Sequence, residues 1–208
     1  KRIPGSPNIN MSINANLSQN SNTKSVYLTL PTFQGNMDRI FPFEPKDKPK
    51  KGLIQNINFQ YSTRAENRIQ TTEDDLFTGK MFENSRTGIQ HTIPLSTNFK
   101  ILKYFNMAAS VNYLEVWQPK TIKYNDYDPT IGIAVKDTIS GLKAFRTYSY
   151  GINMATNIYG TVNFKGDGKI RSIRHTIRPS ISYSSAPSFD QYYDEYIIDA
   201  DGNTREYS

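Results

Sequence analysis

The chain has 208 residues, of which 37% are hydrophobic, 21% are charged and none is cysteine, and its net charge is +6. Its mean hydropathy is −0.62, and no stretch approaches the ~18 consecutive apolar residues of a spanning helix, which excludes a helical membrane protein. Without cysteine, a disulfide framework and a thiolate metal or nucleophile site are also excluded. The positive charge favours phosphate-bearing partners, either nucleic acid or membrane lipid.

Apolar and polar residues alternate from Ile9 to Ser18, which predicts a strand with one apolar face. The same alternation recurs along the chain. It predicts seven strands, at residues 9–18, 26–30, 53–65, 87–101, 105–113, 148–164 and 173–183. Pro31 is expected to end the second strand, and Gly166, Asp167 and Gly168 are expected to turn the chain between the last two. The polar faces are rich in uncharged Asn and Ser, which are poor strand formers, and this composition favours a face that lines a water-filled lumen.

Long polar segments separate some of these strands, and short turns separate others. Long segments are expected at 31–52, 67–86, 118–143 and 186–208, and short turns at 102–104 and 165–169. Outer-membrane barrels combine short periplasmic turns, long outer loops and alternating strands of roughly 10 residues. Segment 31–52 would fall on the short-turn side, where its length is unusual. We expect the whole chain to be part of a single barrel domain.

The predicted fold class is all-β, as a fragment of a large transmembrane antiparallel β-barrel with about seven strands here. Seven strands do not close a bacterial barrel, which has an even number and at least about eight. No apolar stretch follows Lys1, so no targeting peptide is expected. A soluble β-sandwich would also explain the alternation. The fourth and sixth strands favour the barrel, since they have about 15 residues or more, against about 5–6 in globular sheets.

Several segments resemble one family, the lipopolysaccharide-assembly outer-membrane protein of the LptD type in its divergent form. Each segment is a weak signal, but their order and spacing together are specific. They are Leu28-Thr29-Leu30-Pro31, Arg39-Ile40-Phe41-Pro42-Phe43, the run from Gly88 to Asn106, Ile158-Tyr159-Gly160, and the run from Ser172 to Ser184.

This resemblance implies a large barrel, integral to the outer membrane of a Gram-negative bacterium, that inserts lipopolysaccharide into the outer leaflet. It implies three partners: lipopolysaccharide, a periplasmic jellyroll bridge protein, and an outer-membrane lipoprotein plug of the LptE type. It also implies that the chain is an interior part of the barrel and is not an enzyme. The alternatives are another large outer-membrane transporter or porin, and an outer-membrane lipid-modifying enzyme.

Four basic residues fall in the inward, polar register of the predicted strands: Arg64, Lys100, Arg174 and Arg178. They are candidate contacts to lipopolysaccharide phosphate, because cations form charge-assisted hydrogen bonds to phosphate oxygens. The alternative is that they line water or pair with acidic neighbours. Pro94 and Pro179 lie inside predicted strands, where proline weakens pairing because it donates no hydrogen bond. They mark either a seam that opens or a bulge that adjusts the register.

The sequence predicts no catalytic, metal or cofactor site, and no nucleic-acid interface. His91 and His175 each lie in an apolar register without a third ligand at metal spacing or a neighbouring serine nucleophile, so we expect them to be packed or interfacial. Residues 199–203 resemble a calcium loop only faintly and predict a hairpin turn. The basic connection that contains Lys46, Lys48, Lys50 and Lys51 predicts a solvated linker, with contact to anionic lipid or a partner as the alternative.

Overall fold

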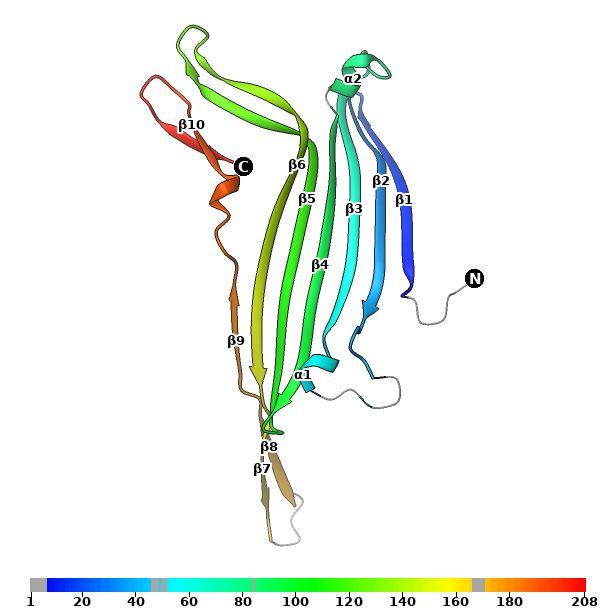
Figure 1. Cartoon of the computed structure of the whole chain (residues 1–208), viewed down its shortest axis with the longest axis vertical. Coiled ribbons are helices and arrows are strands. Elements are labelled where there is room, and N and C mark those ends of the chain that lie inside the picture. The colour runs from blue at the N-terminus through cyan, green and yellow to red at the C-terminus, as the bar shows by residue number, and fades with distance from the viewer. Residues whose placement is uncertain (1–6, 46–48, 50–51, 84, 166–170) are drawn as a thin grey trace.

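A computed structural model describes residues 7–45, 49, 52–83, 85–165 and 171–208. The main element is a curved, seven-stranded antiparallel sheet (Figure 1). Its strands, in spatial order, are β1 (Ile9–Asn20), β2 (Ser25–Ile40), β3 (Asn58–Thr72), β4 (Arg86–Ile101), β5 (Phe105–Asp128), β6 (Ile133–Ala155) and β9 (Ser180–Ser185). Two further pairs are β7 (Ile158–Asn163) with β8 (Ser172–Ile177), and β10 (Asp194–Ile197) with β11 (Thr204–Tyr207).

In the described residues, helical structure is confined to short segments in the connections. They are α1 (Gly52–Gln55), α2 (Gly79–Glu83) and the 3-10 turn η1 (Asp190–Tyr192). Among the described residues, no helix is both long enough and apolar enough to cross a membrane. The prediction of an all-β chain with seven antiparallel strands is therefore confirmed.

The second strand is longer than predicted, because β2 continues through Pro31 to Ile40. Its pairing with both neighbours shifts here, between Thr29 and Thr32, so that one extra residue is accommodated in β2. A bulge of this kind is one of the few places where a strand tolerates proline, because the missing N–H is not needed in the ladder. The expectation that Pro31 ends the strand was wrong for this reason.

Other strand bounds also differ from the prediction. The third strand begins at Asn58, because Leu53 lies in α1, where its carbonyl oxygen accepts a hydrogen bond of 2.7 Å from Thr97 Oγ1. The predicted sixth and seventh strands each divide in two, and β7 and β8 form a hairpin that projects below the sheet (Figure 1). The divisions coincide with Pro179, whose carbonyl oxygen accepts the Thr156 N–H at 3.2 Å. The expected turn at Gly166, Asp167 and Gly168 lies outside the described residues.

The two faces of the sheet differ sharply in chemistry. Residues directly opposite each other in neighbouring strands share a face. One face therefore carries the rows Ile93–Tyr113–Tyr148, Leu95–Val111–Tyr150 and Phe99–Met107–Met154, and the other carries rows such as Ser96–Ser110–Gly151. The apolar face is exposed: Ile152 is 47% and Ile181 is 65% accessible, and no second sheet covers them in the described chain. A soluble sandwich would bury this face.

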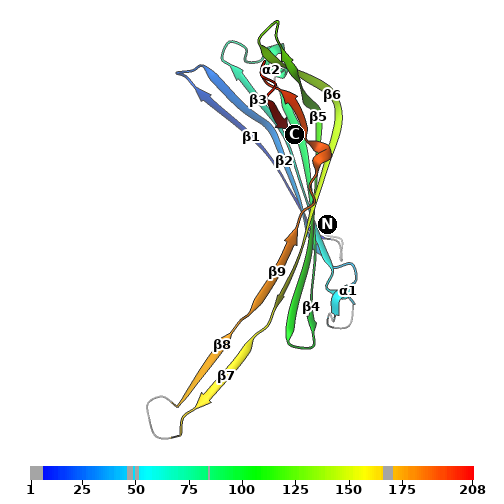
Figure 2. The ribbon, with the colours of Figure 1, turned by 90° about the vertical axis from the view of Figure 1, so that its left-hand side faces the viewer.

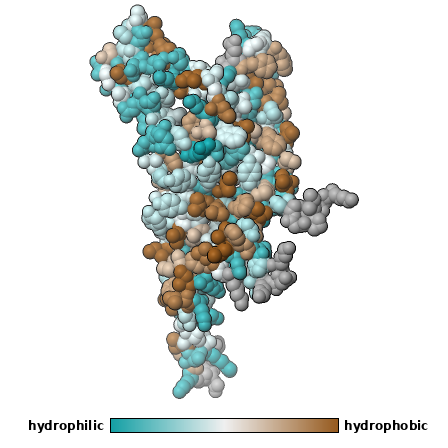
Figure 3. Space-filling view, in the orientation of Figure 1, coloured by the Kyte–Doolittle hydropathy of each residue, from teal (hydrophilic) through white to brown (hydrophobic). Residues whose placement is uncertain are grey.

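Hydrophobic side chains gather across the lower half of the sheet on the face seen in Figure 3, and hydrophilic side chains are most abundant at its upper left and centre. The helix α1 lies on this same face, since its Leu53 bonds to Thr97 of the apolar register. The buried core is small: Val26, Leu28 and Ile69 pack against Met81 of α2 at the upper end. The apolar belt of the sheet thus faces outwards and is not the core of a globular domain.

The β5–β6 hairpin is much longer than predicted and bends near its upper end (Figures 1 and 2). The bend coincides with a register shift between Gln118 and Lys120, opposite Gly141. Gly141 has a φ of 143°, a conformation that residues with a side chain rarely adopt. Most of the segment 118–143, predicted as a loop, is therefore paired strand.

The β10–β11 hairpin packs against the bent end of β5. The ring of Tyr124 stacks on Tyr196 with centroids 4.6 Å apart and meets the edge of Tyr207 at 5.1 Å. The backbone N–H of Ile197 donates to Asp126 Oδ1 at 2.9 Å. Aromatic pairs of this kind stabilise by about 0.5–1.5 kcal/mol each beyond the area they bury. Segment 186–208, predicted as a loop, therefore folds back onto the sheet.

Asp199 organises the turn between β10 and β11, as expected for a hairpin turn at 199–203. Its carboxylate accepts hydrogen bonds from the Asn203 side chain at 2.8 Å and from the Asn203 and Asp201 backbone at 3.1 Å each. These bonds favour the charged form, with the Asn203 side chain contributing most, and lower the pKa of Asp199. The stabilisation of the turn is fully present above the usual Asp pKa of about 3.9 and is lost as the pH falls through the lowered value.

We therefore expect the Asn203 amide resonance to titrate with a midpoint below about 3.9. Nuclear magnetic resonance of the protein in detergent micelles, recorded against pH, measures this midpoint. The Asp199→Asn variant keeps the shape of the side chain and should abolish the titration. A midpoint at or above the usual value would contradict this account of the turn.

Candidate functional site

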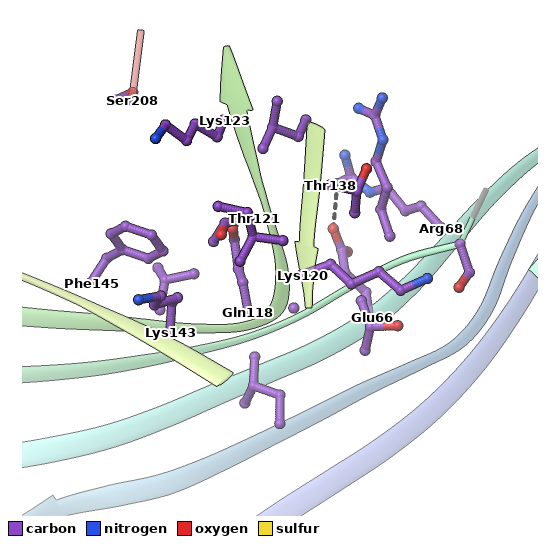
Figure 4. A pocket seen from close by; sticks show the side chains of 18 of the residues that line it. Glu66, Arg68, Gln118, Lys120, Thr121, Lys123, Thr138, Lys143, Phe145 and Ser208 are labelled. Carbon is purple, nitrogen blue, oxygen red and sulfur yellow. Dashed lines mark ion pairs between the residues drawn. The ribbon is translucent and has the colours of Figure 1, made fainter. Parts of the chain in front are cut away.

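The polar face of the sheet holds a hollow of about 1600 Å³ beneath the bent end of β5–β6. We call this hollow the basin. Its walls come from β3, β4, β5 and β6, and from segments 191–194 and 207–208 (Figure 4). Seven basic side chains line it, namely Arg64, Arg68, Arg86, Lys120, Lys123, Lys136 and Lys143. Three acidic residues accompany them, namely Glu66, Asp75 and Asp194.

Strand alternation positions the basin residues. Arg64, Glu66 and Arg68 lie two residues apart along β3 and therefore share the polar face. The β3–β4 pairing places Arg86 directly opposite Arg68, and the β5–β6 pairing places Lys143 directly opposite Gln118. Four strands thus present charge to one hollow, because the sheet curves and the β5–β6 hairpin bends over it.

The acidic residues of the basin neutralise only some of its cations. Glu66 pairs with two guanidinium groups, with Arg64 Nη2 at 2.8 Å and with Arg68 Nη2 at 2.5 Å. Lys120 and Lys143, by contrast, have no ion-pair partner among the described residues, and Figure 4 shows both lining the basin. Unpaired ammonium groups grouped in one concavity create a positive potential that attracts anions.

The chemistry of the basin suits an anionic group attached to a polar molecule. Lysine ammonium and arginine guanidinium groups bind phosphate oxygens through charge-assisted hydrogen bonds. Gln118, Thr121 and Thr138, which Figure 4 also shows in the lining, add donors and acceptors of the kind that bind hydroxyl groups. The basin can therefore hold a phosphorylated, hydroxyl-rich headgroup.

The structure does not bring the four predicted contact residues together. Arg64 lines the basin. Lys100 lies on the same polar face but at the opposite end of β4, across from Asn106. Arg174 lies in the β7–β8 hairpin, with its guanidinium 4.4 Å from the centre of the Tyr159 ring. Arg178 falls between β8 and β9.

The prediction missed most of the basin cations, including Arg68, Arg86, Lys120 and Lys143, because it assigned segments 67–86 and 118–143 to loops. One local signal was available for β3. The alternation that carries Arg64 continues without a break through Glu66 and Arg68. For β5 and β6 the bulge interrupts the alternation, so sequence period gave no comparable signal.

Pro94 and Pro179, the two prolines predicted to weaken strand pairing, lie at different kinds of position in the sheet. Pro94 lies opposite Asn112 in an unbroken β4–β5 ladder. On the β3 side of β4, Ile93 and Pro94 have no partner in the ladder, which resumes at the pair Phe59–Leu95 in the same register. Pro179 separates β8 from β9. Proline thus interrupts the ladder locally at both positions, as its missing N–H requires.

The histidines lie apart from the basin. His91 is on the apolar face, where its Nδ1 is 2.7 Å from Tyr61 Oη and its ring is 4.5 Å from that of Trp117. His175 pairs with Gly160 in the β7–β8 hairpin. Within the described ranges, no group of three or more His, Cys, Asp or Glu side chains could hold a metal ion. The linker cations Lys46, Lys48, Lys50 and Lys51 lie outside the described residues.

The fold and the basin together define a class of protein: a section of β-barrel wall with an apolar outer face and a polar, basic inner face. A family model described as "LptD protein" matches residues 1–208. The chain belongs to this family, and its sheet is a fragment of an outer-membrane β-barrel. Searches of curated proteins and of solved structures each returned no match. Family membership assigns the chain a role as a transport component in lipopolysaccharide transport and assembly at the Gram-negative outer membrane.

Proposed function

We propose that the chain is part of a translocon that inserts lipopolysaccharide into the outer leaflet of the outer membrane. All of its residues belong to one barrel domain. The observation that carries the proposal is the basin, in which Lys120 and Lys143 face a hollow without ion-pair partners in the described part of the chain. A phosphorylated amphiphile needs such a polar, basic lumen for its headgroup and an apolar surface for its acyl chains.

The other cations of the polar side lie towards the opposite end of the sheet. Lys100 is near the lower end of β4, while Arg174 and Arg178 lie in or beside the β7–β8 hairpin that projects below it (Figure 1). We place this lower end on the periplasmic side. A periplasmic jellyroll bridge protein would deliver lipopolysaccharide to this end. Its phosphates would contact these three residues first and then pass to the basin.

Two further elements of the proposal concern release and closure. Lipopolysaccharide would leave sideways where strand pairing is weak, and the interruptions at Pro94 and Pro179 are candidate weak points. An outer-membrane lipoprotein of the LptE type would occupy part of the lumen. The polar inner face, which is rich in Asn and Ser, suits contact with such a plug as well as with water.

Site-specific photocrosslinking tests the proposal in living cells. A photoreactive amino acid at Thr138, in the basin, should form a light-dependent adduct with lipopolysaccharide. Because the basin would hold lipid only in transit, the adduct should disappear when lipopolysaccharide synthesis is stopped. Ile152, on the outer face of the same strand, is the matched control. Its adducts, formed with resident lipid, should not depend on new synthesis.

Two outcomes would contradict the proposal. One is the absence of a lipopolysaccharide adduct at Thr138. The other is a Thr138 adduct that persists without new synthesis, since that lipid would be static. Another large transporter or a porin predicts the first outcome, because lipopolysaccharide would never enter its lumen.

A further inference from the structure

An ion pair interrupts the apolar outer face of the sheet. Glu115 of β5 and Arg146 of β6 lie directly opposite each other, with Arg146 Nε donating to Glu115 Oε1 at 3.0 Å. They share this face with Tyr113 and Trp117. An ion pair within the hydrocarbon of a membrane would be costly, because neither charge would be hydrated. The pair must therefore lie at the level where hydrocarbon ends.

The spacing along β5 agrees with this level. The apolar outer residues run from Phe105 to Tyr113, eight residue steps, which at ~3.3 Å each span about 26 Å of strand. A strand tilt of about 40° reduces this to about 20 Å along the membrane normal, close to the ~25 Å apolar band of outer-membrane barrels. The rings of Tyr113 and Trp117 then fall where such barrels carry their upper aromatic girdle.

The hydrogen-bonding capacity of the pair is used unequally. The Glu115 carboxylate accepts three hydrogen bonds, from Tyr113 Oη at 2.8 Å, Trp117 Nε1 at 2.8 Å and Arg146 Nε at 3.0 Å. Its side chain is only 15% exposed. Arg146 has five N–H donors, but its Nη groups have no partner among the described residues, and its side chain is 62% exposed. The exposed edge of the guanidinium is therefore free to bind an acceptor.

Segment 186–193 covers the edge of β6 at the level of Arg146. It runs along that edge, where Tyr192 Oη accepts the backbone N–H of Arg146 at 2.9 Å. The Phe189 ring packs against Tyr148 at 5.6 Å, and the Tyr192 ring packs against Phe145 at 5.3 Å. Phe145 and Tyr192 belong to the basin side of the sheet, whereas Tyr148 shares the apolar face with Arg146. Arg146 thus presents its guanidinium from the wall of the sheet, on the same face as Tyr148.

We propose that Arg146, oriented by Glu115, binds the phosphate of a membrane lipid on the outer wall of the barrel. The site lies on the opposite face from the basin and does not depend on cargo passing through the lumen. A membrane lipid fits better than a soluble anion, because the guanidinium lies beside an exposed apolar belt that acyl chains would cover. Glu115 holds Arg146 through Nε and leaves the planar fork of Nη donors to the phosphate.

Trp117 is the only tryptophan of the chain and donates to Glu115, so its fluorescence reports on the lipid at this site. The full protein, with any tryptophan outside residues 1–208 replaced by phenylalanine, is reconstituted in vesicles of a neutral, phosphate-free galactolipid. Two vesicle preparations are compared. In one, a minor fraction of the lipid is phosphatidylglycerol with brominated acyl chains; in the other, the same fraction is galactolipid with brominated acyl chains. Bromine quenches tryptophan on contact. Preferential quenching by brominated phosphatidylglycerol measures local enrichment of the phosphate lipid.

We expect brominated phosphatidylglycerol to quench Trp117 roughly tenfold more effectively than the brominated galactolipid, since a charge-assisted hydrogen bond to phosphate is strong enough for a preference of that order. Arg146→Gln should reduce the ratio to near one, and Arg146→Lys should retain part of it. Lys103→Gln, in the short turn between β4 and β5 and outside the basin, removes one positive charge at the other end of β5 and should leave it unchanged. Added inorganic phosphate should not compete, whereas competition by it would overturn the assignment to a membrane lipid.

Glu115→Gln separates lipid binding from a purely structural ion pair. It removes the neutralising charge and keeps a hydrogen-bonding side chain, so enrichment of the phosphate lipid should be equal to or greater than in the unaltered protein. If the ion pair were purely structural, Glu115→Gln and Arg146→Gln would change the quenching ratio alike. A quenching ratio near one in the unaltered protein, or a ratio that Arg146→Gln does not change, would overturn the proposal. Neither result would bear on the Thr138 crosslink, so failure of this site is distinguishable from failure of the translocon.

Discussion

Reversing the charge of two basin residues, as Lys120→Glu with Lys143→Glu, is expected to reduce delivery of lipopolysaccharide to the cell surface by roughly tenfold or more. Each charge-assisted hydrogen bond to phosphate contributes about 1.5–3 kcal/mol, and the new carboxylates would repel the phosphate as well. Neither lysine has an ion-pair partner among the described residues, so the reversal breaks no salt bridge there. Pulse-labelled lipopolysaccharide, detected at the surface with an external probe, measures the delivery rate.

Barrel assembly must be unchanged for this result to count, and the heat-modifiable mobility of the folded barrel in gel electrophoresis checks it. Lys103→Glu, in the short turn after β4, is a matched reversal outside the basin and should have little effect. The reversal of Arg174 and Arg178 compares the lower cations with the basin and should slow delivery too if phosphates pass them first. Normal delivery in the Lys120 and Lys143 double variant would show that the basin does not bind the transported lipid.

Placing a carboxylate on the outer face is expected to destabilise the barrel, with Ile152→Asp costing roughly 2 kcal/mol or somewhat less near the membrane midplane. Ile152 projects from the apolar face and is 47% exposed in the described chain, so a charge there would face hydrocarbon. Asn153→Asp is the matched control, because the next residue of the same strand points to the polar face, opposite Ser182. Its cost should be close to zero.

The free energy of unfolding of both variants in lipid vesicles, from denaturant titrations, tests this assignment of faces. Ile181 of β9 lies directly opposite Met154 of β6, so Ile181→Asp provides a second position on the outer face. Its cost should be similar at the same depth and far smaller near an interface. An equal loss of unfolding free energy in Ile152→Asp and Asn153→Asp would contradict the assignment of one face to hydrocarbon and the other to water.

The assignment of faces could be predicted from the sequence because it depends on a local geometric fact. Successive side chains of a strand point to opposite sides, so the period of two in Ile93, Leu95 and Phe99 already separates an apolar face from a polar one. The antiparallel order of neighbouring strands follows from the short turn between Ile101 and Phe105. Strand ends were less predictable. Pro31 is a local stop signal, but pairing with β1 and β3 on either side outweighed it.

The candidate site depended on contacts between distant segments. Arg64 was predicted to face the lumen, yet nothing near it in the sequence indicates that Lys120 and Lys143 line the same hollow. They meet because the β5–β6 hairpin bends at Gly141 and because the β10–β11 hairpin packs against Tyr124.

The sequence by itself determined that this chain is a sheet with one apolar and one polar face, since alternation is a property of neighbouring residues. Only the tertiary structure decided which cations share a hollow. It also decided that Glu115 and Arg146 form a pair on the outer wall. Register and curvature set the distances between strands, and both arise from cooperative pairing along the whole sheet, which no local pattern of residues encodes.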